Sequence, residues 1–298
     1  MSEPVYILLP VHNRRSVTTR LVGALNDQTK PDFRLVLIDD GSRDGTAEAV
    51  RSLRPETIVI QGEGNWWWAG CLDQACQWLA KQNVPPDTVV CIMNDDVEIA
   101  ADFVEQAVAE LAENPGTLLL ARQRDAATRQ EFNGGGGVRV DLDRLIFKGE
   151  SNPAAINCLP TRGLFLRWGD LQRAGGFRPR LFPHYLSDYE FTFRAHRRGL
   201  RLRVGETAAI YSLPNQSGWG AEGLFTQPRG RRVKILCSKR FTGNPVALSI
   251  FAWLAVPAWR WPKLALIVWG NFLLLFVRCV LYRSPAKPGK ADPPGPSI

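Results

Sequence analysis

The stretch TVVCIMNDD, residues 88–96, decides the fold class of this chain. An apolar run that ends in polar, turn-forming residues predicts a buried strand, here closed by Asn94, Asp95 and Asp96. A helix-length amphipathic segment stands on each side of it, AGCLDQACQWLAKQ before and residues 101–113 after. Such alternation is typical of an α/β protein, in which ligands bind beyond the carboxyl ends of the strands.

The same alternation extends over the first 121 residues. Strands are expected at residues 5–10, 34–40, 57–61, 88–96 and 117–121. Helices are expected at residues 16–28, 44–54, 69–82 and 101–113. Ser16 is expected to cap the first helix and Asp44 the second. This order predicts a Rossmann-like, mostly parallel sheet that is covered by helices on both faces.

Four segments follow these strands and therefore share one rim of the predicted sheet. They are residues 11–13, 39–42, 62–70 and 94–96. The third contains Trp66, Trp67 and Trp68, and no single helix or strand turns three adjacent side chains to one face. We expect at least one indole to face the ligand and to stack on a base or a sugar ring. The alternative is that the loop packs on its own helix.

Two acidic pairs lie on this rim. For Asp39 and Asp40, ordinary turn chemistry competes with hydrogen bonding to a nucleobase or ribose. Asp95 and Asp96 repel each other unless a positive charge lies nearby, and a divalent cation that bridges a diphosphate would satisfy this need. The sequence has no GxxxxGK[ST] or GxGxxG phosphate loop. Mn²⁺ and Mg²⁺ both suit oxygen ligands of this kind.

Seven motifs then occur along the chain: PVHNR, IDDGS, GEGNWWWAG, MNDDV, LPTRGLFL, GGF and PHYLSDYEFTFRAHRRG. Their order and spacing resemble the inverting family 2 glycosyltransferases with the GT-A fold. The likeness covers about residues 4–212 and extends to bacterial rhamnosyltransferase-like enzymes of polysaccharide assembly. It implies a GT-A catalytic domain at residues 1–228, with a donor half at about 1–121 and an acceptor half at about 122–228.

The resemblance and the rim argument together assign the donor side. The expected donor-binding residues are Pro10, Val11, Asn13, Asp40, Trp67, Trp68, Gly70 and Asp95. Asp95 and Asp96 are the expected metal ligands. One departure is Asp73, because relatives often carry asparagine there. A negative charge near a diphosphate is unfavourable unless it turns outward or meets the metal.

The acceptor side follows from LSDYEFTFRAHRRG, which has helical spacing. By the resemblance Asp188 is the general base that an inverting transfer needs, and its place in the first turn favours the ionised carboxylate. Glu190 and Arg194 stand four residues apart, so a helix ion pair of about 0.3–0.5 kcal/mol is the alternative to a direct role. The expected acceptor-side residues are Arg162, Gly163, His184, Glu190 and Arg194.

The last seventy residues carry the basic charge of the chain. From residue 229 onward there are 12 Lys and Arg residues against Asp292 alone, within a formal net charge of +8 for the whole chain. This asymmetry predicts contact with an anionic surface, which we expect to be a membrane and not a nucleic acid. Residues 229–283 are therefore expected to form a basic, apolar, membrane-associating helical region, and residues 284–298 a disordered tail.

Two uncharged segments lie within this region, at residues 246–259 and 264–277. Each is shorter than the ~20 residues that a spanning helix needs, so interfacial or re-entrant segments are favoured. A helical cap packed on the catalytic domain, or one span over residues 264–282, are the alternatives.

The function expected from the sequence is metal-dependent transfer of a sugar, hexosyl or rhamnosyl, from a nucleotide-sugar donor to a glycan or polyprenyl-linked acceptor. The setting would be cell-surface polysaccharide or cell-wall assembly at the cytoplasmic face of the inner membrane, by a peripheral or monotopic protein. The N-terminus predicts no signal peptide, and the six cysteines show no metal-binding spacing. A membrane-anchored nucleotide-sugar-binding protein without catalysis and a nucleotidyltransferase are the alternatives.

Overall fold

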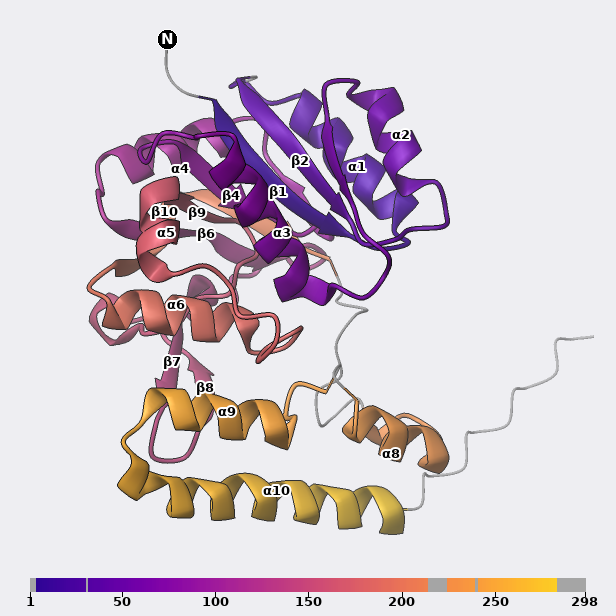
Figure 1. Ribbon diagram of the computed structural model, residues 1–298, viewed down its shortest axis with the longest axis vertical. Helices are drawn as coiled ribbons and strands as arrows, with labels where there is room; N and C mark the ends of the chain where they lie inside the picture. The colour runs from indigo at the N-terminus through magenta and orange to yellow at the C-terminus, as the bar shows by residue number, and fades with distance from the viewer. Residues whose placement is uncertain (1–3, 31, 214–223, 239–240, 283–298) are drawn as a thin grey trace, which may run out of the picture.

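The computed structural model describes residues 4–30, 32–213, 224–238 and 241–282 (Figure 1). It has an α/β body and, below that body in the view, a layer of C-terminal helices. The body is built on one large sheet of eight strands, with a separate two-stranded hairpin. The predicted α/β class is therefore confirmed. The tail expected to be disordered, residues 284–298, lies outside the described residues.

The large sheet is mainly parallel. The strands are β1 (Val5–Val11), β2 (Phe33–Asp39), β3 (Ile58–Gln61), β4 (Val89–Ile92), β5 (Val97–Ile99), β6 (Thr117–Asp125), β7 (Val138–Asp141), β8 (Ile146–Gly149), β9 (Leu164–Arg167) and β10 (Arg201–Ser212). The large sheet has the order β3-β2-β1-β4-β9-β6-β10-β5, and β7 pairs with β8. β9 runs antiparallel to β4 and β6, and β5 runs antiparallel to β10. The parallel strands β1, β2 and β4 consequently end at the same edge.

Helices cover both faces of this sheet. The helices of the sheet layers are α1 (Arg15–Asn26), α2 (Thr46–Leu53), α3 (Trp67–Lys81), α4 (Phe103–Ala112), α5 (Trp168–Ala174) and α6 (Ser187–Arg197), and those of the C-terminal layer are α8 (Arg229–Leu236), α9 (Pro245–Ala255) and α10 (Trp261–Leu281). One buried apolar cluster joins α1, α2 and α4 to the sheet, and a second joins α3, α5 and α6 to the opposite face. The two faces explain why strands such as β1 are buried along their whole length.

The capping of the first two helices differs in part from the prediction. The prediction that Ser16 caps the first helix is wrong, because α1 begins at Arg15 and Ser16 lies inside the first turn. Asp44 takes that place by accepting a hydrogen bond from the backbone N–H of Arg15 at 3.0 Å. The same carboxylate accepts from the N–H of Thr46 at 3.1 Å at the start of α2. One residue therefore satisfies donors at the beginnings of two helices.

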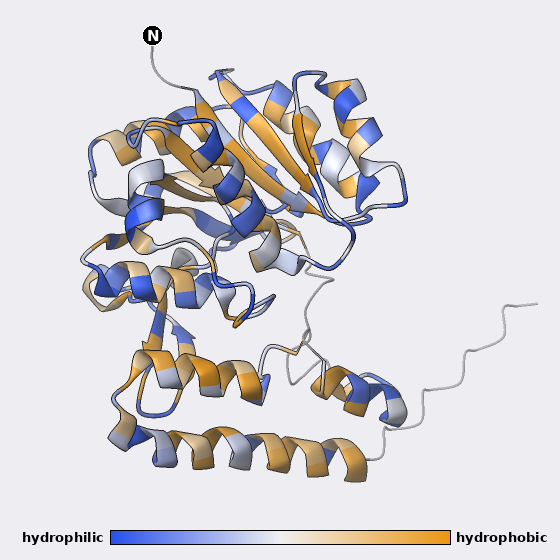
Figure 2. Ribbon diagram, viewed as in Figure 1, coloured by the Kyte–Doolittle hydropathy of each residue, from blue (hydrophilic) through white to orange (hydrophobic). Residues whose placement is uncertain are grey.

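The C-terminal layer is divided between a packed helix and an exposed one (Figures 1 and 2). Phe251 of α9 is buried against Phe147 of β8 and Phe193 of α6. α10 packs on α9 and, near its other end, on α8. The helical-cap alternative therefore describes α9. α10 is 21 residues long, because it starts at Trp261, between the two uncharged segments, and continues past the end of the second one to Leu281.

Candidate functional site

A cavity of about 470 Å³ opens where β1, β2 and β4 end. Its lining residues are Pro10, Val11, His12, Asn13, Arg14, Asp40, Gly64, Trp67, Trp68, Cys71, Asn94, Asp95, Asp96 and His184. The structure thus brings together residues from the four segments that the sequence placed on one rim. Of the expected donor-binding residues, Gly70 alone is outside this lining; it borders a neighbouring cavity.

Asp40 organises one wall of this cavity. Its Oδ1 accepts hydrogen bonds from the backbone N–H groups of Gly64 and Asn65, at 2.8 and 3.1 Å. Its Oδ2 accepts from those of Trp66 and Trp67, both at 3.0 Å. Four donors match the roughly four acceptor positions of a carboxylate. Asp40 therefore fixes the tryptophan loop and the N-terminus of α3, and its contact with a nucleobase stays a prediction.

The three tryptophans divide between the core and the cavity. Trp66 and Trp68 pack against the buried cluster beneath α3, and the Trp68 indole N–H donates to Thr161 Oγ1 at 3.2 Å. Trp67 has a positive φ of 57°, which is rare for a bulky residue and changes the direction of its side chain. Its ring lies 5.6 Å from that of His184. Trp67 and Trp68 both line the cavity, and Trp67 is the one of the three that does not pack against the core cluster.

Asn13 is held between two loops of the rim. Its backbone N–H donates to Ser42 Oγ at 2.8 Å, and its side-chain oxygen accepts from the N–H of Arg43 at 2.7 Å. His12 makes a 2.6 Å hydrogen bond to the carbonyl of Asp40. The ends of β1 and β2 are thereby fixed relative to each other on the donor side.

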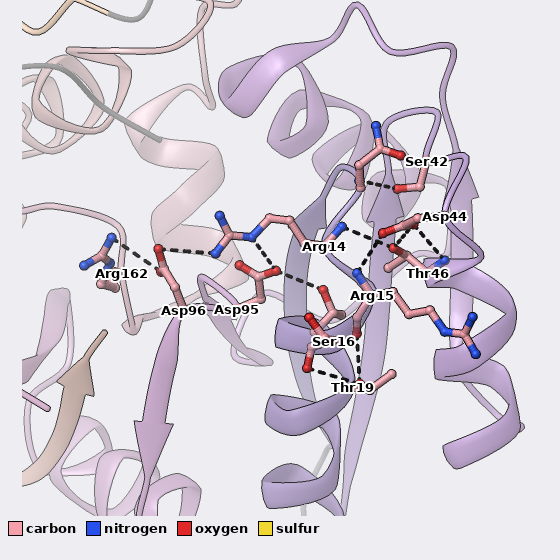
Figure 3. Close-up of polar contacts among 12 residues, drawn as sticks. Arg14, Arg15, Ser16, Thr19, Ser42, Asp44, Thr46, Asp95, Asp96 and Arg162 are labelled. Carbon is pink, nitrogen blue, oxygen red and sulfur yellow. Dashed lines mark hydrogen bonds and ion pairs between the residues drawn. The ribbon is translucent and has the colours of Figure 1, made fainter. Parts of the chain in front are cut away.

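The acidic pair lies between two arginines (Figure 3). Arg14 Nε donates to Asp95 Oδ2 at 2.8 Å, and Thr18 Oγ1 donates to the same oxygen at 2.9 Å. Arg14 Nη2 is 3.5 Å from Asp96 Oδ2, and Arg162 Nη2 is 3.4 Å from Asp96 Oδ1. Both aspartates are buried, and burial raises the pKa of Asp95 although Arg14 opposes that rise. The repulsion expected within the pair is thus offset by protein cations.

A divalent cation fits Asp96 better than Asp95. Asp96 Oδ1 is buried and accepts no hydrogen bond, so it lacks the partner that a buried carboxylate oxygen requires. Asp95 already accepts two strong hydrogen bonds on one oxygen. Among the described residues there is no group of three His, Cys, Asp or Glu side chains that could hold a metal alone. A metal here would need further oxygen ligands from a diphosphate or water.

Asp188 lies in the first turn of α6, as expected. It is partly buried, and burial raises the pKa of its carboxyl to about 6, while the backbone N–H of Tyr189 and the charge of Arg162 act in the opposite direction. The turn before it carries His184, whose side chain lines the cavity. Ser187 Oγ fixes this turn by donating to the carbonyl of His184 at 2.6 Å. An aspartate of this pKa is ionised at neutral pH and is more basic than an exposed one.

A second cavity, of about 640 Å³, adjoins the first. Trp67 and His184 line both cavities, so these two side chains form the boundary between them. The far wall of the second cavity is α9, through Val246, Ala247 and Ile250. Asp73 also lies here, with its carboxylate accepting from Gln77 Nε2 at 2.9 Å. It is turned away from the donor cavity, which removes the conflict that the sequence raised.

Two expected acceptor-side residues, Glu190 and Arg194, lie elsewhere. Arg194 makes a double hydrogen bond to Glu190, at 2.8 and 2.9 Å, and Arg178 lies 3.2 Å from the same carboxylate. Arg194 also donates to the carbonyls of Ala174 and Gly176. Both are buried beside a separate cavity, where the pair ties α6 to the end of α5. This arrangement is that of a structural ion pair.

Gly163 and Arg162 are not among the residues that line the donor cavity, but the Arg162 side chain forms an ion pair with Asp96, which does line it. Gly163 has a φ of +73°, and a side chain there would meet Ala121 and Ile210 closely. Its N–H donates to the carbonyl of Ile92 at 2.9 Å. Glycine at this position lets the chain turn tightly behind the acidic pair.

Arg14 and Thr18 are partners of the acidic pair that the sequence pattern did not predict. Arg14 is part of the PVHNR motif, so a signal was present. The contact itself joins residues 81 positions apart, and only the parallel pairing of β1 with β4 brings them together.

Comparison with known proteins agrees with this geometry. Residues 6–139 match the family described as Glycosyl transferase family 2. No curated protein matched the chain. Three similar solved structures are GalNAc-T7 with UDP, GalNAc and Mn²⁺, Staphylococcus aureus TarS, and the Pyrobaculum calidifontis mannosyltransferase PcManGT with GDP-Man and Mn²⁺.

These structures share the fold at low sequence identity. The TM-scores are 0.59, 0.57 and 0.55, at 14%, 19% and 15% identity. The matches cover 78%, 93% and 92% of this chain, and 47%, 55% and 81% of the other chains. The chain therefore spans about half the length of the first two. Residues 6–139 are thus similar to glycosyl transferase family 2, and the shared architecture shows that the chain has the GT-A fold.

Proposed function

We propose that this protein transfers a sugar, with inversion, from a nucleotide-sugar donor to a lipid-linked acceptor at a membrane surface. One observation carries the proposal: a single cavity collects the ends of β1, β2 and β4 with a buried acidic pair. The family match supports nucleotide-sugar transfer. The three solved structures, which bind UDP, UDP-GlcNAc or GDP-Man in some of their forms, support the donor class but not a particular sugar.

The donor side is assigned to the rim. Pro10, Val11 and Asn13 would line the nucleobase, and the Trp67 ring would lie against a base or sugar ring. Asp96, assisted by Asp95, would hold Mn²⁺ or Mg²⁺. When bound, such a cation neutralises charge on the departing nucleoside diphosphate. The buried Asp96 Oδ1 without a hydrogen bond is the feature that fits this role.

Asp188 is assigned as the general base. Its carboxylate would accept the proton of the acceptor hydroxyl as the hydroxyl oxygen attacks the anomeric carbon. The raised pKa of about 6 suits this task, because the group stays ionised at neutral pH and still binds a proton readily. Arg162 influences the pKa of Asp188 and pairs with Asp96, so its charge lies between the donor and acceptor sides.

The acceptor is assigned to the second cavity. Its inner boundary is the Trp67–His184 pair of the donor cavity, and its outer wall is the apolar helix α9. A molecule that fills it would have a polar end at the donor and an apolar part along α9. A polyprenyl-linked sugar has this character, whereas a free glycan has no apolar chain that could pack against α9.

The exposed face of α10 supports a membrane partner. Its large exposed apolar side chains are Trp261, Leu266, Trp269, Leu273, Leu274, Val277 and Leu281. Trp259 precedes the helix and is 78% exposed. An apolar surface of this extent marks an interaction site, and flanking Lys263 and Arg278 suit anionic lipid.

Within the described residues, one helical segment, Ala258–Leu281, has the length and composition of a membrane span, with only 17% of its window buried. We assign it to lie along the membrane surface. Leu264 and Val268 bury one end of α10 against the α9 layer, and Cys279 buries the other against α8. Arg232 of α8 also donates to the carbonyl of Tyr282 at 2.9 Å. A perpendicular span would have to break these contacts.

A donor screen tests the proposed activity. Thermal shift with UDP-, GDP-, dTDP- and CMP-sugars, with and without Mn²⁺, should identify one donor class that raises the Tm in a metal-dependent way. That donor should then release its nucleotide slowly in water with the wild-type protein and not with Asp96→Ala. Donor binding without any nucleotide release or transfer would instead identify a nucleotide-sugar-binding protein without catalysis.

A further inference from the structure

The two arginines at the acidic pair make unequal contacts (Figure 3). Asp95 is held through one oxygen, since Arg14 Nε and Thr18 Oγ1 both donate to its Oδ2 at less than 3 Å. Asp96 has only two longer ion pairs, at 3.5 Å to Arg14 and 3.4 Å to Arg162. Its Oδ1 accepts no hydrogen bond although it is buried. Asp96 is thus neutralised in charge without being satisfied in hydrogen bonding.

The arginines differ in how firmly they are held. Arg14 is fixed through its hydrogen bond to Asp95 at the beginning of α1. Arg162 is held by its backbone, whose carbonyl accepts from Gln123 Nε2 at 2.8 Å. In the part of the chain that the structure describes, Asp96 is the only ion-pair partner of the Arg162 side chain. The Arg162 guanidinium can therefore leave Asp96 with little loss, whereas Arg14 cannot leave Asp95.

A guanidinium and a divalent cation compete for Asp96. Both are positive, and the Asp96 carboxylate is buried, so their mutual repulsion there is poorly screened. A nucleoside diphosphate changes this balance, because its oxygens offer arginine the bidentate partner that its geometry prefers. The diphosphate also supplies the further oxygen ligands that a cation at Asp96 needs.

We propose that Arg162 is a built-in counter-cation of Asp96, which makes divalent-cation binding depend on the nucleoside diphosphate. Without nucleotide, Arg162 neutralises Asp96 and weakens cation binding. With nucleotide, Arg162 turns to the diphosphate and the cation takes its place at Asp96. This inference rests on the proposed function, because it requires a cation at Asp96. By linkage, the cation and the nucleotide must strengthen each other's binding by the same factor.

Mn²⁺ titrations of the full-length protein test this exchange. Free Mn²⁺ is measured by electron paramagnetic resonance, with no nucleotide and with saturating UDP, GDP or dTDP. The Mn²⁺–nucleotide equilibrium is measured separately and included in the fit. The variants are Arg162→Gln, which removes the charge, and Arg162→Lys, which keeps it. Circular dichroism checks that each is folded, and Arg162→Met is the substitute if Arg162→Gln is not.

Two control variants complete the set. Asp96→Asn removes the proposed cation ligand. Arg122→Gln is the matched control, because Arg122 pairs with Glu131 at 2.9 Å, is 26% exposed, and lies outside the donor cavity. Arg162 is similarly shielded, with 19% of its side chain exposed.

Without nucleotide, Arg162→Gln should bind Mn²⁺ about fivefold or more tightly than wild type, and the factor by which nucleotide strengthens Mn²⁺ binding should shrink correspondingly. Arg162→Lys keeps the charge and should bind Mn²⁺ without nucleotide as weakly as wild type does, and Arg122→Gln should behave as wild type in both quantities. If Arg162→Gln leaves both quantities unchanged while Asp96→Asn loses Mn²⁺, the counter-cation role is overturned and the metal site stands. If the wild-type protein binds no Mn²⁺ with any nucleotide, both proposals fall.

Discussion

The donor cavity and the face of α10 differ in how far the protein itself satisfies their side chains. In the cavity, Asp40 accepts four backbone hydrogen bonds and Asp95 accepts two from side chains, so polar groups are fixed before any ligand arrives. On α10, Leu266 and Leu281 are 78% and 71% exposed. The first region is organised by the protein alone. The second needs an apolar environment that the described residues do not supply, which is why we assign it to a membrane.

Substitutions can test this contrast between the donor cavity and the face of α10. The largest expected effect is the loss of transfer rate on substitution of Asp188. Asp188→Asn keeps the size of the side chain but removes the proton acceptor, so transfer should fall by about 10²–10⁴-fold. Donor affinity should stay near that of wild type, since the assigned role is on the acceptor side. Transfer is measured by nucleotide release in the presence of acceptor.

Asp170→Asn is the control for that substitution. Asp170 lies in α5, and burial raises the pKa of its carboxyl too, but it lies outside the donor cavity. Its variant should retain wild-type transfer. An Asp188→Asn protein that transfers normally would rule out the general-base role.

A second substitution tests the other region. Leu273→Glu together with Leu274→Glu should lower the partition of the protein onto anionic liposomes by about 100-fold or more, because two exposed leucines lose their apolar burial. Flotation measures the bound fraction in low and high salt. Donor binding should not change, since neither residue lines the cavity.

Leu53→Glu, at an exposed leucine that ends α2, is the control and should leave flotation unchanged. If the wild-type protein itself does not float with the liposomes, the membrane assignment is wrong and the exposed face of α10 binds a different partner.

A third substitution tests the fixed wall of the donor cavity. Asp40→Asn places an amide NH₂ opposite backbone N–H donors, so the free energy of unfolding should fall by about 1–3 kcal/mol. Urea denaturation measures this change, and donor affinity should fall in parallel. Asp39→Asn is a useful comparison, because the Asp39 carboxylate accepts one hydrogen bond, from the Ser42 N–H. This substitution should lower the free energy of unfolding by less than Asp40→Asn does. Equal stability of Asp40→Asn and wild type would mean that the loop does not depend on the carboxylate.

The pH dependence of transfer should report Asp188. With a pKa of about 6, the base is protonated in acid, so the transfer rate should fall about tenfold per pH unit below pH 6 and level off above it. The stability effect has a definite sign: the folded-state pKa is raised above 3.8, so its stabilisation exists at low pH and is lost as pH rises through about 6. Asp188→Asn should therefore be more stable than wild type at pH 8. A rate that is flat from pH 5 to pH 8 would contradict the assignment.

The smallest expected signal comes from the tryptophans. Saturating nucleotide sugar should change the fluorescence of Trp67 most, because it alone of the three stands between the two cavities. Trp67→Ala should remove most of that change, whereas Trp66→Ala should keep it. Ten tryptophans dilute the signal, so difference spectra are needed. Equal responses in both variants would favour loop packing over ligand contact.

The sequence predicted the first half of the sheet because each of its strands is a local apolar run followed by polar residues. It did not predict β5, which has three residues, or the antiparallel β9, whose place between β4 and β6 depends on long-range pairing. The rim residues were predicted for the same reason as the strands. The positions of Glu190 and Arg194 were not, because helical spacing places them on one face without showing which element that face meets.

Local sequence patterns also could not predict which cations pair with Asp95 and Asp96. The sequence showed that Asp95 and Asp96 need positive charge, and a metal was the simplest source. Arg14 and Arg162 supply it from segments that lie far away in the chain. Which cation neutralises a carboxylate is a property of the folded arrangement, and spacing alone does not reveal it.

The four hydrogen bonds at Asp40 have a kinetic consequence. A loop held at four successive amides by one carboxylate opens only if all four bonds are lost together, so we expect no slow loop opening before the donor associates. The association rate should then be set by diffusion and by the local electrostatic field, with a marked dependence on ionic strength. Stopped-flow traces of donor association should accordingly show one concentration-dependent phase, and differences in affinity between donors should reside in how fast each one departs.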